Sequence, residues 1–207
     1  MVKELDVQDV FPVKTYFYID EKTGSGFVID PGAEPEKIYE YILRNGWNIE
    51  KILLTHGHMD HIGAVTYLEE RLHVPAMIHD DEKEFLKDGY LNLSDNYGQT
   101  LIVEDYSLIK DKDIIRLKEN PDFYLEVIHG PGHTPGSVIF FNPKDKLAFI
   151  GDVLFEHGKG LTHFPGGDES LLEETIIKKL FSLPDDTLLY SGHAEPITVK
   201  EEKELLM

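Results

Sequence analysis

The chain has 207 residues, of which 41% are hydrophobic, and it carries a formal net charge of −19. This length and composition suffice for one domain with a substantial core, so we expect residues 1–207 to form a single domain. The negative charge repels phosphate backbones and disfavours nucleic acid as a partner, while the absence of cysteine excludes disulfides, a thiolate nucleophile and cysteine-bound zinc.

No apolar run approaches the roughly 20 residues of a membrane-spanning helix. The first residues, Met-Val-Lys-Glu-Leu-Asp, contain no apolar signal segment. We therefore expect a cytoplasmic protein that acts on a small molecule, without a membrane partner. The sequence indicates no particular oligomeric state.

The first part of the chain predicts β structure followed by a helix. Residues 11–20 and 26–30 have the pattern of two strands joined by a polar, glycine-containing turn. Pro35 is typical of a helix start, and Gly46 is typical of the position just after a helix end. A first helix is therefore expected between them, with Ile38 on its apolar face.

Residues 51–63, Lys-Ile-Leu-Leu-Thr-His-Gly-His-Met-Asp-His-Ile-Gly, place four potential metal ligands directly after an apolar strand. His56 and His58 are two positions apart in extended backbone and point the same way, whereas Asp60 and His61 lie at a helix start and point elsewhere. Imidazole and carboxylate bind zinc-type cations, and two cations roughly 3.5–4 Å apart activate water and polarise a carbonyl or phosphoryl oxygen. The stretch therefore predicts two neighbouring metal positions.

The rest of the chain alternates strands and helices, which predicts a mixed α+β fold. Residues 88–112 carry mainly loop-forming signals and remain unassigned. Further strands are predicted at 75–79, 113–116, 123–129, 137–141, 146–150 and 188–190. Helices are predicted over 62–72 and 81–87, from a capping box at Ser170 to Glu173, and after Thr198.

Three more potential ligands each follow a strand-like apolar run. They are His133 in Gly-Pro-Gly-His-Thr-Pro-Gly, Asp152 in Phe-Ile-Gly-Asp, and His193 in Tyr-Ser-Gly-His. In order and context, these motifs and the His-x-His-x-Asp-His stretch resemble the metallo-β-lactamase superfamily. The resemblance spans roughly residues 10–200. It implies a four-layer αβ/βα sandwich, with two mixed sheets inside, helices outside and the metals at one sheet edge.

The same resemblance implies a ligand set for two divalent metal ions. One metal would be held by His56, His58 and His133, the other by Asp60, His61 and His193, with Asp152 bridging both. Asp60 and Asp152 would also be catalytic. Zinc is the expected metal, with iron or manganese as alternatives. Asp30, in an Asp-Pro-Gly turn, either supports the histidine loop by a hydrogen bond or only forms the turn.

Within the superfamily, residues 151–155, 164–168 and 183–187 resemble small glyoxalase II (hydroxyacylglutathione hydrolase) relatives. This implies hydrolysis of a thioester or a related activated acyl substrate. Two departures leave the acyl group and the thiol open, glutathione included. Leu161 and His163 stand where relatives carry a basic residue and then Asp or Tyr, and residues 194–196 replace a segment that contacts glutathione.

The alternative function is that of a persulfide dioxygenase with one iron on His56 or His58, His133 and Asp152. Relatives with that activity usually carry arginine where this chain has Leu161, which ranks this function second. A binding protein on an inactive fold is disfavoured, because all seven ligand positions are retained.

Four other residues are candidates for the neighbourhood of the site. His79 follows a strand and a role other than metal binding is favoured for it. His157 and His163 are equally consistent with a pocket lining and with a solvated loop. Lys159 is a candidate for the basic group that position 161 lacks.

Overall fold

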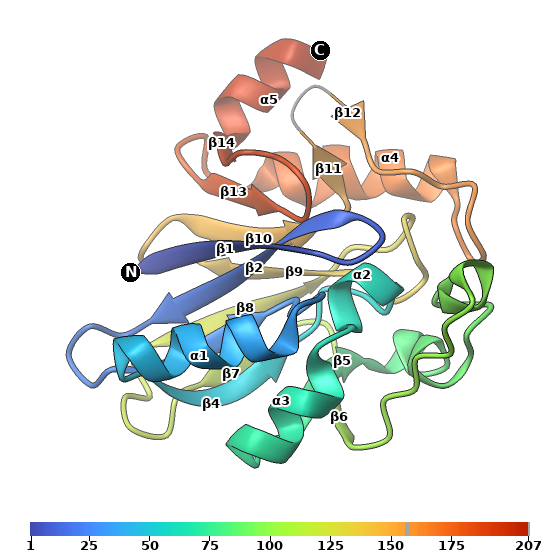
Figure 1. The fold of residues 1–207 in the computed structure, drawn as a ribbon. Coiled ribbons are helices and arrows are strands. Elements are labelled where there is room, and N and C mark those ends of the chain that lie inside the picture. Colours follow the sequence, from blue (N-terminus) through green and yellow to red (C-terminus); the bar gives the residue numbers. More distant parts are fainter. Residues whose placement is uncertain (156–157, 207) are drawn as a thin grey trace.

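Two mixed sheets of six strands each form the centre of the fold, in a computed structural model that describes residues 1–155 and 158–206. The first sheet comes from the N-terminal part of the chain and the second from the C-terminal part (Figure 1). In spatial order the first sheet contains β1 (Val2–Gln8), β2 (Pro12–Ile19), β3 (Ser25–Ile29), β4 (Asn48–Leu53), β5 (Ala76–His79) and β6 (Tyr106–Ile109). The strands from β1 to β3 pair antiparallel, and those from β3 to β6 pair parallel.

The second sheet is mainly antiparallel, and only β10 and β13 are paired in parallel among its described strands. In spatial order it contains β14 (Ile197–Thr198), β13 (Leu188–Ser191), β10 (Leu147–Gly151), β9 (Val138–Asn142), β8 (Tyr124–His129) and β7 (Ile114–Arg116). Two short strands, β11 (Leu154–Phe155) and β12 (Gly158–Lys159), pair with each other outside both sheets.

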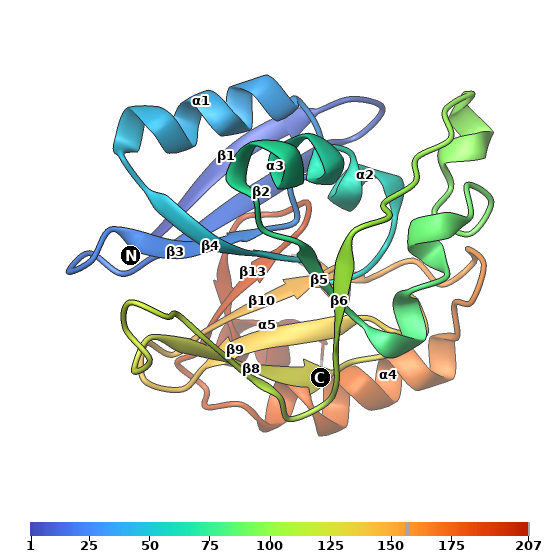
Figure 2. The ribbon, with the colours of Figure 1, turned by 90° about the horizontal axis from the view of Figure 1, so that it is seen from below.

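Helices cover the outer faces of the two sheets. Figure 2 shows α1 and α3 on the side of the first sheet and α4 on the side of the second. The helices are α1 (Pro35–Asn45), α2 (Met59–Ile62), α3 (Val65–Leu72), α4 (Glu169–Lys178) and α5 (Val199–Leu206). Short 3-10 helices are η1 (Asp80–Glu82), η2 (Phe85–Lys87), η3 (Ser94–Tyr97) and η4 (Leu180–Ser182). No described helix is long and apolar enough to cross a membrane.

Three apolar cores separate four layers. Strand β2 shows how the sequence builds them: Phe17 and Ile19 belong to the core beneath α1, whereas the alternate residues Tyr16 and Tyr18 pack against the second sheet. A third core joins the second sheet to α4 and α5 and includes Leu172. The layer order helix, sheet, sheet, helix confirms the αβ/βα sandwich that the motifs implied.

Two helix predictions were wrong in their boundaries. The helix expected over 62–72 is two helices, because Gly63 packs against Gly32 and the amide of Ala64 donates to the carbonyl of Pro31. A Cβ on Gly63 would lie only 2.3 Å from the carbonyl oxygen of Gly32. The stretch 81–87 forms two separate 3-10 turns instead of one helix.

The two predicted capping boxes had different outcomes. The one at Ser170 was wrong, because α4 already begins at Glu169 and Asp168 caps it by accepting a hydrogen bond from the amide of Leu171 at 3.0 Å. The one at Thr198 is confirmed, since Thr198 Oγ1 accepts from the amide of Glu201 while the Glu201 carboxylate accepts from the amide of Thr198. The strands β1 and β6 and the two-residue strands β11, β12 and β14 were not anticipated.

Candidate metal centre

One end of the sandwich brings together the side chains that the motifs identified as metal ligands. Each follows a strand of the central sheets or begins the helix after one, so the carboxyl ends of β4, β8, β10 and β13 position them. His56 and His58 follow β4, Asp60 and His61 lie in α2, His133 lies between β8 and β9, Asp152 follows β10 and His193 follows β13. Both halves of the chain therefore contribute to the same site.

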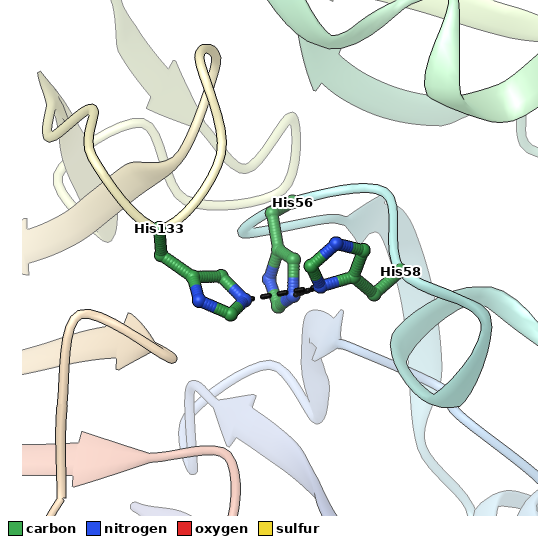
Figure 3. Close-up of side chains that lie close together, drawn as sticks. All are labelled: His56, His58 and His133. Carbon is green, nitrogen blue, oxygen red and sulfur yellow. Dashed lines mark hydrogen bonds between the residues drawn. The ribbon is translucent and has the colours of Figure 1, made fainter. Parts of the chain in front are cut away.

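Three imidazoles form a first ligand group, defined as His56, His58 and His133 (Figure 3). Nε2 of His56 lies 3.1 Å from Nδ1 of His58, and Nε2 of His133 lies 3.0 Å from the same atom. All three side chains are buried. Nitrogens that share a tetrahedral zinc ion lie roughly 3.3 Å apart, so the spacing matches a set of metal ligands.

Neighbouring oxygen atoms fix the tautomers of two of these imidazoles. The hydroxyl of Thr55 donates to Asp30 at 2.6 Å, so its oxygen accepts the Nδ1 proton of His56 at 3.1 Å. The carbonyl of Leu161 accepts the Nδ1 proton of His133 at 2.7 Å. In the neutral rings, both Nε2 atoms then carry a lone pair that faces His58. Nδ1 of His58 has at most one proton to donate to these two lone pairs. Three nitrogens that face one point in this way form the arrangement that a cation satisfies.

The second ligand group, defined as Asp60, His61 and His193, lies beside the first. Nε2 of His193 is 3.3 Å from a carboxylate oxygen of Asp60, and Nε2 of His61 is 3.9 Å from the same oxygen. The carbonyl of Pro12 accepts the Nδ1 proton of His193 at 2.6 Å, which orients this ring. This group is less enclosed than the first, since the side chains of His193 and Asp60 remain 25% and 16% exposed.

Asp152 lies between the two groups. Its Oδ1 is 3.3 Å from Nε2 of His61, and its Oδ2 is 3.3 Å from Nε2 of His193 and 3.7 Å from Nε2 of His133. One carboxylate therefore reaches both groups. Gly192 makes room for it, because a Cβ there would lie 2.4 Å from Oδ1 of Asp152 and 2.6 Å from the ring of His61.

Asp30 supports the site from behind, as one of the two sequence interpretations stated. Its Oδ1 accepts from the amide of Thr55 at 2.8 Å, and its Oδ2 accepts from the hydroxyl of Thr55 and from Nδ1 of His61. The carboxylate thus orients His61 directly and His56 through Thr55. Carboxylates that hold ligating histidines in this way typically strengthen metal binding.

The two groups differ in charge. Burial lowers the pKa of His56 and His133 and lowers the pKa of His58 to about 3, so the first group is neutral near pH 7. Despite its burial, the pKa of His61 is raised well above its usual value by the charges of Asp152, Asp60 and Asp30.

The pKa of the carboxylate between the groups is shifted in the complementary direction. Burial alone would raise the pKa of Asp152, but the positive charge of His61 and a hydrogen bond from His193 hold it well below its usual value. Hydrogen bonds to Asp152 and Asp60 raise the pKa of His193 to about 10 against the effect of burial. The protons on His61 and His193 therefore neutralise the negative charge of the carboxylates. A bound cation would neutralise that charge instead.

Unpaired buried atoms give a direct test of whether the site fits metal ions. Among the described residues, Nε2 of His58, Nε2 of His61 and Oδ1 of Asp152 are buried and make no hydrogen bond of normal geometry, and the last two lie 3.3 Å apart as an ion pair. A bound cation would take the place of the proton that His61 holds and would give both atoms of this pair a strong partner. The donor set therefore fits divalent metals.

Glu82 is a buried residue that the sequence analysis missed. Its Oε1 accepts from the amide of Gly57 at 3.0 Å, and its Oε2 accepts from the amide of Gly136 at 2.7 Å. Gly57 separates His56 from His58, and Gly136 lies in the loop of His133. One carboxylate in η1 therefore ties together the two loops that supply the first group.

A cavity of about 290 Å³ opens beside the ligand groups. Its polar side is formed by members of both groups and by Asp152. The residues of that polar side are His58, Asp60, His133, Asp152 and His193. The site can therefore bring a small molecule into contact with both metal positions.

The other candidate residues lie away from this cavity. The ring of His79 stacks on that of His129 with centroids 4.2 Å apart, outside both ligand groups, and with Asp81 these two residues form a separate cluster of potential ligand atoms. His163 is exposed and contacts the ring of Phe164 without lining the cavity. Lys159 pairs with acidic residues of α4 and lines a different cavity. His157 falls outside the described residues.

Comparison with known proteins agrees with this architecture. The sequence profile of the Metallo-beta-lactamase superfamily matches residues 9–193. The hydroxyacylglutathione hydrolase GloC of Haemophilus influenzae is 36% identical over 89% of this chain and 86% of that protein. The crystal structure of BLEG-1 B3 metallo-beta-lactamase superposes with a TM-score of 0.92 at 31% identity, covering 99% of this chain and 97% of that one.

A second solved structure, TTHA1623 in a di-iron-bound form, superposes with a TM-score of 0.85 at 30% identity over 98% of both chains. The profile match covers most of the chain, and the relatives are similar over nearly their whole length. The fold and the order of the ligand motifs agree with these matches. The chain therefore belongs to the metallo-beta-lactamase superfamily.

Proposed function

We propose that this protein is a dinuclear metallo-hydrolase that cleaves a thioester or a related activated acyl compound. The observation that carries the proposal is the position of Asp152. Its carboxylate lies 3.3 Å from Nε2 of His61 and 3.7 Å from Nε2 of His133, so it reaches both ligand groups. A carboxylate between two cations neutralises charge and fixes their separation, which a site for one metal does not need.

When bound, two divalent cations lower the pKa of water from 15.7 to about 7 and stabilise the oxyanion that develops on the substrate carbonyl. In our proposal, His56, His58 and His133 would hold one cation, Asp60, His61 and His193 would hold the other, and Asp152 would contribute to both. Zinc is the first candidate, because imidazole and carboxylate are its usual ligands without cysteine. Iron and manganese accept the same donors, and the di-iron form of TTHA1623 supports iron as the alternative.

The protein's own groups would orient the reaction. Asp60 faces the cavity and is proposed to accept a hydrogen bond from the attacking water. The water oxygen forms the new bond to the carbonyl carbon, the carbon–sulfur bond breaks, and the sulfur leaves with the electron pair and takes up a proton. Because the thiol is a good leaving group, the chain needs no side-chain nucleophile.

The relative GloC supports a thioester as the substrate, since its name describes a hydroxyacylglutathione hydrolase. The charge of −19 supports a small molecule over nucleic acid. We further propose that the protein acts in the cytoplasm without a membrane partner.

The test is hydrolysis of a panel of thioesters and esters by protein loaded with zinc, iron or manganese. We expect turnover by the wild type well above that of a matched Asp152→Asn variant, with two metal ions per chain by elemental analysis. Equal rates for wild type and variant with every metal would reject the proposed hydrolase.

β-Lactam hydrolysis is a second candidate, favoured by the likeness to BLEG-1 B3 metallo-beta-lactamase. The same water would attack a strained amide instead of a thioester. Parallel assays with a chromogenic β-lactam and a thioester rank the two, and we expect the thioester to give the larger kcat/KM. The persulfide dioxygenase alternative predicts one iron per chain and oxygen uptake with glutathione persulfide, so both measurements separate it from hydrolysis.

A further inference from the structure

The cavity beside the ligand groups also has an apolar wall. This wall is built by segments from both halves of the chain. Its residues are Phe11, Pro12, Leu93, Phe155, Leu161 and Phe164. A substrate carbonyl placed at the ligand groups would therefore have hydrocarbon and aromatic surface around its remaining atoms.

We propose that this cavity selects a short apolar acyl group carried on an uncharged thiol, in preference to a 2-hydroxyacyl group carried on glutathione. The proposal rests on the proposed thioester hydrolysis and narrows its substrate class. Two observations carry it, the construction of the apolar wall and the distribution of charge around it.

Leu93 shows that the wall is built with some backbone strain. Its φ of 72° lies in the left-handed region, which a branched residue such as leucine rarely adopts. Asn92 holds this conformation, because its side-chain amide donates to the carbonyls of Phe85 and Leu101 at 2.9 Å and its oxygen accepts from the amide of Ser94. A leucine kept at a strained position beside a candidate site indicates a role for its side chain there.

The same loop is attached to the ligand-bearing helix. The amide of Met59, at the start of α2, donates to the carbonyl of Asn92 at 2.9 Å. Leu93 is therefore held at a defined distance from Asp60, the next residue of that helix. A wall fixed to the ligands in this way can discriminate between acyl groups by shape and polarity.

Charge around the cavity disfavours an anionic substrate. Within residues 1–155 and 158–206, no lysine or arginine lines it. Lys14 is engaged by the carboxylates of Glu4, Asp6 and Glu195 at 3.0 to 3.3 Å. Lys159 lies outside the cavity and pairs with α4. The nearby cations are therefore already neutralised.

Acidic residues also make the surface next to this cavity negative. The adjoining cavity, which shares Phe11 and Asp60 with this one, is lined by Asp9 and by Glu34, which pairs with Lys37 at 2.8 Å. Glutathione carries two carboxylates and one ammonium group, so away from the ligand groups its carboxylates would approach a negative surface without a lysine or arginine partner. A neutral thiol avoids that repulsion.

The volume of about 290 Å³ limits the acyl group. Pockets for drug-sized ligands start at about 300 Å³, so this cavity is at the small end of that range and suits a small thioester. Burial of one methylene group favours binding by about 0.8 kcal/mol, which corresponds to about fourfold in affinity. We expect kcat/KM to rise about three- to fourfold per methylene from acetyl to butyryl and then to level off.

The first experiment compares matched thioesters on metal-loaded wild-type protein. Acetyl, propionyl, butyryl and lactoyl groups are each presented on N-acetylcysteamine, which is uncharged, and on glutathione. We expect butyryl-N-acetylcysteamine to exceed lactoylglutathione at least tenfold in kcat/KM. Preference for lactoylglutathione would overturn this inference and leave the proposed hydrolase intact, whereas no turnover of any thioester above Asp152→Asn would reject the hydrolase itself.

The second experiment alters the wall. Leu93→Asn keeps a similar side-chain size, and asparagine tolerates the left-handed conformation, so the variant is expected to fold. Leu161→Asn changes a side chain that is already half exposed. Leu43→Asn, on the exposed face of α1, is the control. We expect the first two variants to lose about tenfold of the butyryl-over-lactoyl preference and the control to retain it.

A binding measurement makes the result independent of turnover. Calorimetry of metal-loaded wild type should give tighter binding of butyrate than of lactate, and Leu93→Asn should remove the difference. Equal affinity of the wild type for both acids, or an unchanged difference in both wall variants, would overturn the assignment of the wall.

Discussion

The first and second ligand groups lie side by side, yet the protein surrounds them differently. The first contains only imidazoles, is buried, and is neutral near pH 7 because burial lowers the pKa of its members. The second contains a carboxylate and two imidazoles of raised pKa, and the side chain of His193 is 25% exposed. The difference is that the first candidate position is enclosed and neutral, whereas the second is charged and partly open to solvent.

The supports of the two groups differ in the same way. Glu82 binds the backbone of both loops that carry the first group. The second group depends on contacts to single rings, from Asp30 to His61 and from the carbonyl of Pro12 to His193. We therefore expect the first position to bind metal more tightly and to exchange it more slowly.

The largest expected effect comes from Asp152→Asn. This change should weaken metal binding at both groups, so the expected difference in metal affinity between them should disappear. The amide keeps the size of the side chain but removes its charge and one anionic oxygen, so activity should fall by at least about a hundredfold and bound metal should decrease. Turnover and elemental analysis measure this.

Circular dichroism provides the control for Asp152→Asn. The three apolar cores do not include Asp152, so the spectrum should stay near that of the wild type. Full activity in the variant would remove the bridge from the proposal. An unfolded variant would show instead that the metals are structural.

The next largest effect should distinguish the two groups by the amount of metal that each retains. His61→Ala removes a ligand from the second group only, so about one metal per chain should remain, held by His56, His58 and His133. His73→Asn is the matched control, because His73 lies away from the site in a left-handed conformation that asparagine tolerates. Equal loss of both metals in His61→Ala would contradict the two-group assignment.

A smaller effect should come from Glu82→Gln. Glutamine can accept from only one of the two backbone amides, so the loops of the first group should loosen and its metal affinity should fall about tenfold. Glu69→Gln is the control, since Glu69 also accepts a backbone amide, that of Ala76 at 2.7 Å, but lies in α3. Metal competition with a chelator measures the affinity, and a larger loss from the second group would reverse the comparison.

A last effect concerns stability instead of metal binding and is a pH dependence of the metal-free protein. Burial raises the pKa of Glu82 from 4.5 to about 7. The folded state then keeps a proton that the unfolded state has lost, so stability falls as the pH rises through this interval, by about 3 kcal/mol in total. Glu82→Gln cannot lose a proton and should lack this contribution.

Chemical denaturation at pH 4 and pH 8 measures the change. We expect Glu82→Gln to gain stability relative to the wild type at the higher pH. An unchanged difference between the two proteins would show that Glu82 does not titrate in this range.

Much of the fold was predictable, because most strands are apolar runs bounded by turn residues. β1 was missed because it is an edge strand with mainly exposed, polar side chains. β6 was missed because it lies in a stretch rich in loop signals, and its pairing with β5 is not visible locally. The position of the α4 start depended on whether Asp168 or Ser170 caps it, and both residue types are good caps.

The residues of the metal centre were predictable because short motifs carry them at the ends of recognisable strands. The supporting residues were not. Glu82 lies in the acidic run Asp-Asp-Glu-Lys-Glu, where nothing local distinguishes it from its neighbours. Its role arises from Gly57 and Gly136, which only the fold brings near. The left-handed backbone of Leu93 was not predictable either, because leucine does not indicate that conformation.

The hydrogen bond from His193 to the carbonyl of Pro12 has a consequence for folding. It joins residues 181 positions apart, whereas the contact between His58 and His133 spans 75 positions. Closing a longer loop costs more chain entropy, and contacts distant in sequence form late. The second group should therefore be the last part of the site to assemble after synthesis and the first to come apart when strand β13 loosens.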